Sequence, residues 1–158
     1  MTKTFSHLDE TGGISMVDVG SKRITMREAV AVATVRMSPE TLRKLVERAL
    51  PKGDVLTTAK VAGVLAAKRT PSLIPLAHPL VITSIDVTFD LDQSTGAIEV
   101  HSIVRCEGKT GAEIEAMTAC AVAALTIYDM CKSAEKGITI ESLQLVRKSG
   151  GKSGTWER

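Results

Sequence analysis

The segment 109–132, KTGAEIEAMTACAVAALTIYDMCK, decides the fold of this chain. From Ala116 to Tyr128 it has no charged residue, and most of its side chains are small. A helix with such a sequence is apolar almost all the way round, so it must be buried on more than one side. Thr110 and Glu113 fit the T-x-x-E capping box, which predicts that the helix begins at this point.

Ionisable residues flank this apolar run at both ends. Asp129 and Lys132 are three residues apart and therefore share one helical face. They form either a solvated ion pair or, when partly buried, an acid/base pair with shifted pKa values. Glu115 lies about 21 Å from Asp129 along the helix axis, so no small reacting group contacts both. Three explanations stay open: one end is structural, the ligand is long, or helix ends from two subunits meet. The small, Ala-rich face favours the last.

Composition limits the classes of function. The chain has 158 residues, enough for a single domain over 1–158 with a sizeable core. Its net charge of +2 and its 3% of aromatic residues argue against binding to nucleic acid or to an anionic membrane. Three cysteines, an odd number with no C-x-x-C pair, favour a reduced, cytoplasmic protein. No apolar leader follows Met1, and the 109–132 helix is too short and too interrupted by charge to span a bilayer.

Hydrophobic periodicity outlines the other elements. The polar residues 1–28 predict a mostly irregular arm, and residues 149–158 a flexible Gly-rich tail. Apolar patterns predict strands over 29–37, 80–92, 97–107 and 138–148, and helices over 39–50 and 55–68. Gly137 is predicted to end the 109–132 helix. Alternation places one set of apolar residues of the second strand on the same face: Val81, Ile85, Val87, Phe89 and Leu91. The order β-α-α-β-β-α-β predicts an α+β, ferredoxin-like fold, an antiparallel four-stranded sheet with helices packed on one face and an extra helix inserted.

Two further segments carry candidate binding groups. The segment 68–79, KRTPSLIPLAHP, contains three prolines, which predict a stiff, non-helical connection. Its His78 is either a structural histidine or, because the loop is rigid, a ligand-binding one. The segment 148–154, KSGGKSG, lacks the first glycine of a P-loop. Lys148 and Lys152 can still bind an anion together with backbone amides.

Six segments taken in order cover nearly the whole chain: MVDV (16–19), KGDV (52–55), AKRTPSLIPLAHPL (67–80), GKTGAEIEAMTA (108–119), AALTIYDMCK (123–132) and KSGGKSG (148–154). Together they resemble the cyclic pyranopterin monophosphate synthase family, which belongs to molybdenum-cofactor biosynthesis. The resemblance implies a lyase that converts 3′,8-cyclo-7,8-dihydroguanosine 5′-triphosphate to cyclic pyranopterin monophosphate and releases diphosphate. It also implies a ferredoxin-like fold and a homo-hexamer, a trimer of dimers with active sites at subunit interfaces.

The matching motifs also imply the roles of particular residues. Asp129 and Lys132 resemble the acid/base pair, with Lys52 as a further reaction-site cation. The resemblance implies a larger set of substrate-binding residues: Leu76, Ala77, His78, Glu113, Ile114, Glu115, Lys22, Arg27, Asp18 and Lys148. The carboxylates among them suit a guanine-derived ring, which presents N–H donors. The cations suit a triphosphate, which needs a local positive cluster even in a near-neutral protein.

The sequence predicts no cofactor and no protein-held metal, because no set of residues has metal-ligand spacing. A magnesium ion accompanying the triphosphate or diphosphate remains compatible with this expectation. The alternative function is a non-catalytic, oligomeric small-molecule-binding module with the same fold. Such a module binds its ligand without releasing diphosphate.

Overall fold

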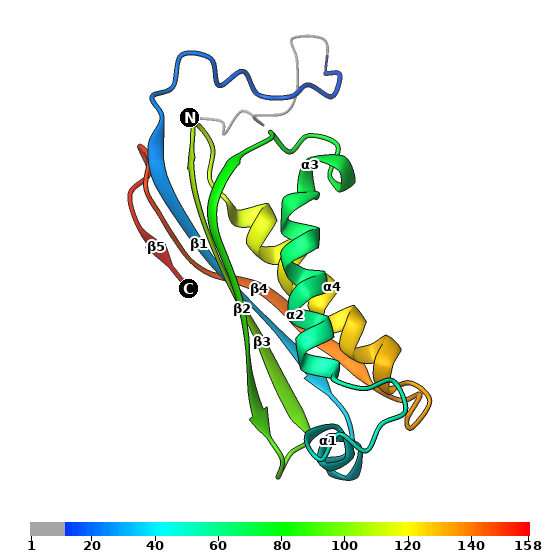
Figure 1. Ribbon diagram of the computed structural model, residues 1–158. Coiled ribbons are helices and arrows are strands. Elements are labelled where there is room, and N and C mark those ends of the chain that lie inside the picture. Colours follow the sequence, from blue (N-terminus) through cyan, green and yellow to red (C-terminus); the bar gives the residue numbers. More distant parts are fainter. Residues whose placement is uncertain (1–11) are drawn as a thin grey trace.

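Residues 12–158, the part of the chain that the computed structural model describes, form one antiparallel sheet with helices against one of its faces (Figure 1). The architecture is α+β, as predicted. Residues 1–11 of the predicted arm lie outside the described part. The elements follow in chain order: β1 Thr25–Arg36, α1 Pro39–Val46, α2 Val55–Lys68, α3 Thr70–Leu73, β2 Val81–Asp92, β3 Ala97–Gly108, α4 Glu113–Cys131, β4 Thr139–Ser149 and β5 Trp156–Glu157.

The sheet has five strands in the order β2-β3-β1-β4-β5, rather than the four that the sequence predicted. The fifth strand lies in the segment predicted as a flexible tail, where Trp156 pairs with Lys148 and Glu157 with Arg147. Gly151 and Gly154 adopt positive φ angles of 72° and 66° in the turn that returns the chain to β4. A strand of two residues is too short to leave a periodic signal in the sequence.

The helix α4 forms the centre of the core, as its apolar sequence predicted. It packs on β1, β3 and β4 on one side and against α2 on another. Its side chains Ala116, Ala119 and Ala123 are fully buried. A Cβ on Gly63 of α2 would lie 2.9 Å from the carbonyl oxygen of Ala119, so glycine permits the close approach of the two helices. The sequence predicted that this helix is too short and too charged for a membrane span, but within the described residues α4 is the one helix with the length and composition of such a span. It packs in the core, as the core helix of a globular domain does.

The ends of α4 differ from the prediction. The helix begins at Glu113, its N-cap is Ala112, and no side chain caps it, so the predicted capping box is wrong. The carboxylate of Glu113 instead accepts a hydrogen bond from Lys148, whose amine competes successfully with the local backbone. The helix ends at Cys131, six residues before Gly137, because a tight turn follows in which the backbone N–H of Glu135 donates to Cys131 O.

Two other boundaries moved because of long-range pairing or local strain. The strand β1 starts at Thr25, not at residue 29, because Thr25 pairs with Gly108 of β3. Part of the predicted irregular arm is therefore sheet. The helix α1 ends at Val46 rather than residue 50, and Arg48 follows with a φ of 54°, which is incompatible with a continuing helix.

Two expectations for residues 68–92 were also wrong. The proline segment contains the short helix α3, because Pro71 occupies its first turn, where no backbone N–H is needed. In β2, Val81 is 70% exposed although the other four alternating apolar residues face the helices. The register of pairing shifts between Ile82 and Ser84, so the side chain of Val81, before the shift, points to the other face of the sheet. The predicted helix 55–68 and strand 97–107 are confirmed within one residue.

Candidate active site

A cavity of 290 Å³ lies where the arm, the proline segment and the start of α4 meet. Seven residues that the sequence assigned to substrate binding line it: Lys22, Leu76, Ala77, His78, Glu113, Ile114 and Glu115. The remaining wall comes from Val17, Val19, Leu80, Thr110 and Gly111. The cavity therefore combines an apolar wall with two carboxylates and one histidine, which suits a flat, polar-edged ring.

The two carboxylates in this cavity differ in their surroundings. Glu115 is only 3% exposed, and burial, together with the neighbouring Glu113, raises its pKa above the ordinary value. Glu113 is half-buried and holds Lys148 at 2.8 Å. Because Glu115 has no cationic partner among the described residues, an N–H donor of a ligand would satisfy it.

A second cavity of 580 Å³ adjoins the first and shares Lys22, Thr110, Gly111 and Glu113 with it. Five cationic side chains and one carboxylate line this second cavity: Lys22, Arg27, Lys109, Lys148 and Lys152, with Glu113. Such an excess of positive charge in one cavity suits a polyanion. The predicted cations Lys22, Arg27 and Lys148 are thus brought together.

The structure adds Lys109 to this cationic set, and sequence reasoning had not singled it out. Its amine donates to the carbonyl oxygen of Gly20, and Arg27 donates to the carbonyl oxygen of Lys109 at 3.2 Å. These bonds fasten the arm to the loop before α4. Gly151 leaves room for the guanidinium of Arg27, because a Cβ at this position would collide with it. The adjacency of Lys109 to the T-x-x-E motif was the signal available in the sequence.

The third group of predicted residues lies at the other end of α4. Asp129 accepts from Lys132 at 2.7 Å and from Lys52, in the loop between α1 and α2, at 2.9 Å. Hydrogen bonds from Lys132 and then Lys52 lower the pKa of Asp129 to about 2, and Asp129 raises that of Lys132. All three side chains are at least two-fifths exposed. The cluster is an ionised carboxylate between two ammonium groups, accessible to a ligand.

Apart from Asp18, the predicted site residues thus lie at opposite ends of one helix: the lining of the two cavities at its start and the Asp129 cluster at its end. Glu113 and Asp129 are roughly 24 Å apart along the axis of α4. One small substrate cannot contact both groups within a single chain. Asp18 lines neither cavity; its carboxylate accepts from the backbone N–H of Gly20 at 2.7 Å and shapes a turn in the arm.

Three side chains of types that can ligate a metal come together elsewhere, on the sheet face opposite the helices. His101 Nε2 lies 3.1 Å from Asp90 and 3.4 Å from Glu99, and all the ligand atoms lie within 4.8 Å of one another. Sequence spacing could not reveal this set, because the register of β2 and β3 creates it. Asp90 and Glu99 are largely exposed, and none of the three residues lines either cavity.

The fold is that of an α+β protein, and its two adjoining cavities have a lining that suits a polar ring and several negative charges. The comparisons then identify its family: residues 16–151 match the MoaC family model, and the chain belongs to that family. It is 56% identical over 149 residues, 94% of each chain, to the cyclic pyranopterin monophosphate synthase of Roseiflexus sp. (strain RS-1). It is 55% identical over 155 residues to the enzyme of that name from Geobacter sulfurreducens, covering 98% of this chain and 97% of the relative.

Proposed function

We propose that this chain is a cyclic pyranopterin monophosphate synthase, a lyase of molybdenum-cofactor biosynthesis. Its substrate would be 3′,8-cyclo-7,8-dihydroguanosine 5′-triphosphate, and its products cyclic pyranopterin monophosphate and diphosphate. The observation that carries the proposal is the pair of adjoining cavities, one with a buried carboxylate and one with five cations. Together they match a guanine-derived ring joined to a triphosphate.

Each cavity has the chemistry that its part of the substrate needs. In the cavity of 290 Å³, the ring cavity, Glu113 and Glu115 could accept hydrogen bonds from the N–H groups on one edge of the ring. Leu76 and Ile114 would contact its faces. His78, which lines the same cavity, can donate or accept a hydrogen bond. In the cationic cavity, the ammonium and guanidinium groups would hold the phosphates, which gather charge as diphosphate leaves.

The cluster at the far end of α4 would perform the proton transfers. Asp129 is ionised at neutral pH and is the proton acceptor of the cluster, whereas Lys132 and Lys52 offer protons and positive charge. Lys52 and Lys132 each donate to Asp129, so the carboxylate holds both ammonium groups close to the same point. These groups carry the reaction only where the substrate reaches them.

The two groups reach one substrate if the active site lies between subunits. We therefore propose a homo-oligomer, a hexamer built as a trimer of dimers, in which Asp129 of one chain faces the ring and phosphate cavities of another. Mixing two inactive variants tests this. Asp129→Asn and the triple variant Lys22→Ala/Arg27→Ala/Lys148→Ala, which lacks three of the five cations of its cavity, should recover about a quarter of the parent activity through mixed dimers when refolded together in equal amounts. No recovery would place all the groups of one site in one chain.

The strand order around β1 supports a ferredoxin-like arrangement extended by β5 and an extra helix, which we propose as the fold type. The three free, buried cysteines fit a reducing compartment, and we propose the cytoplasm. We expect any magnesium to arrive with the phosphates rather than with the protein. No nucleic acid or membrane is part of the proposal.

The direct test is to incubate the protein with the cyclic triphosphate and measure diphosphate release. The parent should release diphosphate, and Asp129→Asn should bind the substrate without releasing it. Binding without release by the parent protein would favour the non-catalytic small-molecule module instead. Unchanged turnover in both Asp129→Asn and Lys132→Ala would refute the catalytic role proposed for these two residues.

A further inference from the structure

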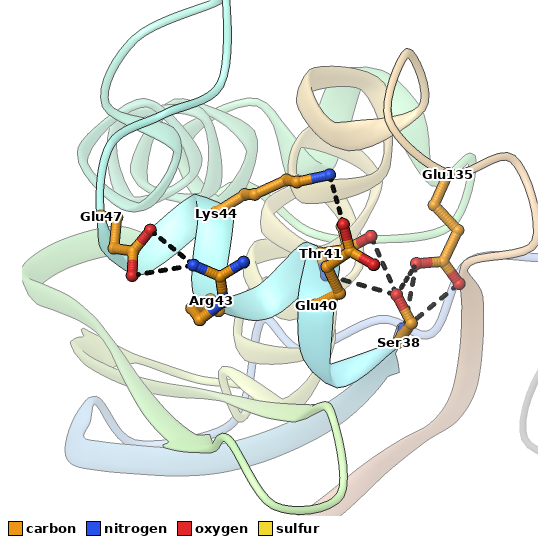
Figure 2. Close-up of polar contacts among 7 residues, drawn as sticks. All are labelled: Ser38, Glu40, Thr41, Arg43, Lys44, Glu47 and Glu135. Carbon is orange, nitrogen blue, oxygen red and sulfur yellow. Dashed lines mark hydrogen bonds and ion pairs between the residues drawn. The ribbon is translucent and has the colours of Figure 1, made fainter.

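The turn after α4 is fastened to the start of α1 by one carboxylate. Glu135 accepts hydrogen bonds from the backbone N–H of Ser38, at 3.0 Å, and from the Ser38 hydroxyl, at 2.8 Å (Figure 2). These bonds join residues 97 positions apart in the sequence and are partly buried. Hydrogen bonds from the Thr41 hydroxyl and from Ser38 N–H lower the pKa of Glu135, so its carboxylate is ionised at neutral pH.

This link lies close in the chain to the Asp129 cluster. Glu135 follows Lys132 by three residues, in the turn whose backbone is bonded to Cys131. Ser38 begins the segment 38–52, and Lys52 at its other end donates to both the carboxylate and the carbonyl oxygen of Asp129 at 2.9 Å. The segment 38–52 is therefore tied to the end of α4 at two points, one partly buried and one exposed.

We propose that Glu135 is a positioning residue for the Lys52–Asp129–Lys132 cluster, because its bonds to Ser38 set where the segment carrying Lys52 begins relative to α4. The inference rests on the proposed catalytic role of that cluster. Within residues 12–158, Glu135 forms no hydrogen bond with any of these three residues. It acts by fixing the two segments that present Lys52 and Asp129.

The bonds of Glu135 are not required to cap α1. Ser38 already caps the helix by accepting from Thr41 N at 3.2 Å. The ion pairs of α1 provide a contrast, since Glu40–Lys44 and Arg43–Glu47 join neighbouring turns of the same helix at exposed positions (Figure 2). Pairs of that kind contribute little to stability and hold no second segment in place.

The test compares Glu135→Ala with Glu135→Gln and with the matched control Glu47→Gln. The glutamine keeps a carbonyl acceptor for Ser38, whereas alanine has none. We expect Glu135→Ala to lower kcat about tenfold through misplacement of Lys52. KM should stay unchanged, because neither Glu135 nor Ser38 lines the two cavities that would bind the substrate. The kcat of Glu135→Gln should stay within about threefold of the parent value. The kcat of Glu47→Gln should equal that of the parent.

A second measurement does not depend on turnover. The rate at which an amine-reactive acetylating reagent labels Lys52, followed by mass spectrometry on the folded protein, should rise in Glu135→Ala only. Lys60, paired with Asp86 at 2.7 Å, serves as the internal reference. Circular dichroism and thermal melting confirm that the variants are folded, and rates are normalised to folded protein.

Parent-like kcat in Glu135→Ala, or unchanged labelling of Lys52, would overturn the positioning role. So would a loss in Glu135→Gln as large as that in Glu135→Ala. The failure of the proposed function gives a different pattern. In that case the parent protein itself releases no diphosphate, whereas the labelling of Lys52 still responds to Glu135→Ala.

Discussion

Lys22 gives the most direct test of the two adjoining cavities, because it lines both of them. Its amine makes no ion pair with any described residue, so its removal uncovers no buried carboxylate. Lys148 is less suitable, since its loss would also release Glu113. The substitution Lys22→Ala therefore removes one cation from the proposed triphosphate site and changes little else.

The size of the effect follows from the contact that Lys22 would make. A hydrogen bond to a charged group contributes about 1.5–3 kcal/mol. Lys22 lies on the exposed arm, so the lower end applies, and about 1.5 kcal/mol corresponds to a roughly tenfold weaker Kd. Lys22→Arg keeps the charge and should lose much less.

Isothermal titration calorimetry with GTP, which has both the guanine ring and the triphosphate, measures this difference. We expect Lys22→Ala to bind GTP about tenfold more weakly than the parent at an ionic strength of about 0.15 M, with a smaller ratio at higher salt. Lys60→Ala is the control, because Lys60 is a paired cation outside both cavities. Equal GTP affinity of Lys22→Ala and the parent, or an equal loss in Lys60→Ala, would refute the assignment of the cationic cavity.

Three further outcomes are expected. Asp129→Asn and Lys132→Ala should each abolish diphosphate release while far-UV circular dichroism stays unchanged. The folded pKa of Asp129 is about 2, below its ordinary value of 3.8, so its ion pairs contribute to stability above pH 3.8 and are lost as the pH falls through 2. Acid unfolding of Asp129→Asn should therefore depend less on pH between these two values than acid unfolding of the parent. Burial raises the folded pKa of Glu115, so its ionisation opposes folding as the pH rises above its unfolded value; Glu115→Gln should therefore raise Tm at pH 7 relative to the parent but not at pH 4, and should weaken GTP binding. Ile127→Ala, at a fully buried position of α4, should lower the free energy of unfolding by about 2–5 kcal/mol in urea titrations, and a loss well below that range would mean that α4 is not the core element described here.

Much of the architecture follows from local patterns in the sequence. The uncharged run between Ala116 and Tyr128 predicted a helix buried on several sides, and α4 contacts three strands and α2. Hydrophobic periodicity predicted α2 and β3 within one residue. Such patterns succeed because they reflect repeats of 3.6 and 2 residues, which depend only on neighbours in the chain. Seven residues that the family resemblance assigned to substrate binding line one cavity, whereas no role there was assigned to Val17, Val19, Leu80, Thr110 and Gly111.

Other features depend on which distant groups meet. Glu113 fits a local capping box, yet its carboxylate pairs with Lys148, 35 residues away. Glu135 has no motif in the sequence, but the fold places it against Ser38. Both results have the same cause: a carboxylate has several possible donors, and tertiary packing decides which of them lies within hydrogen-bond distance.

The sequence by itself therefore determined the buried helix, the α+β class and the types of residue at each end of α4. Only the tertiary structure decided that five cations from the arm, β1, the loop before α4, β4 and the Gly-rich turn line one cavity. It also decided that this cavity and the Asp129 cluster lie at opposite ends of a 19-residue helix. The physical reason is that strand register and chain reversals bring these segments together, and neither leaves a periodic trace in the sequence.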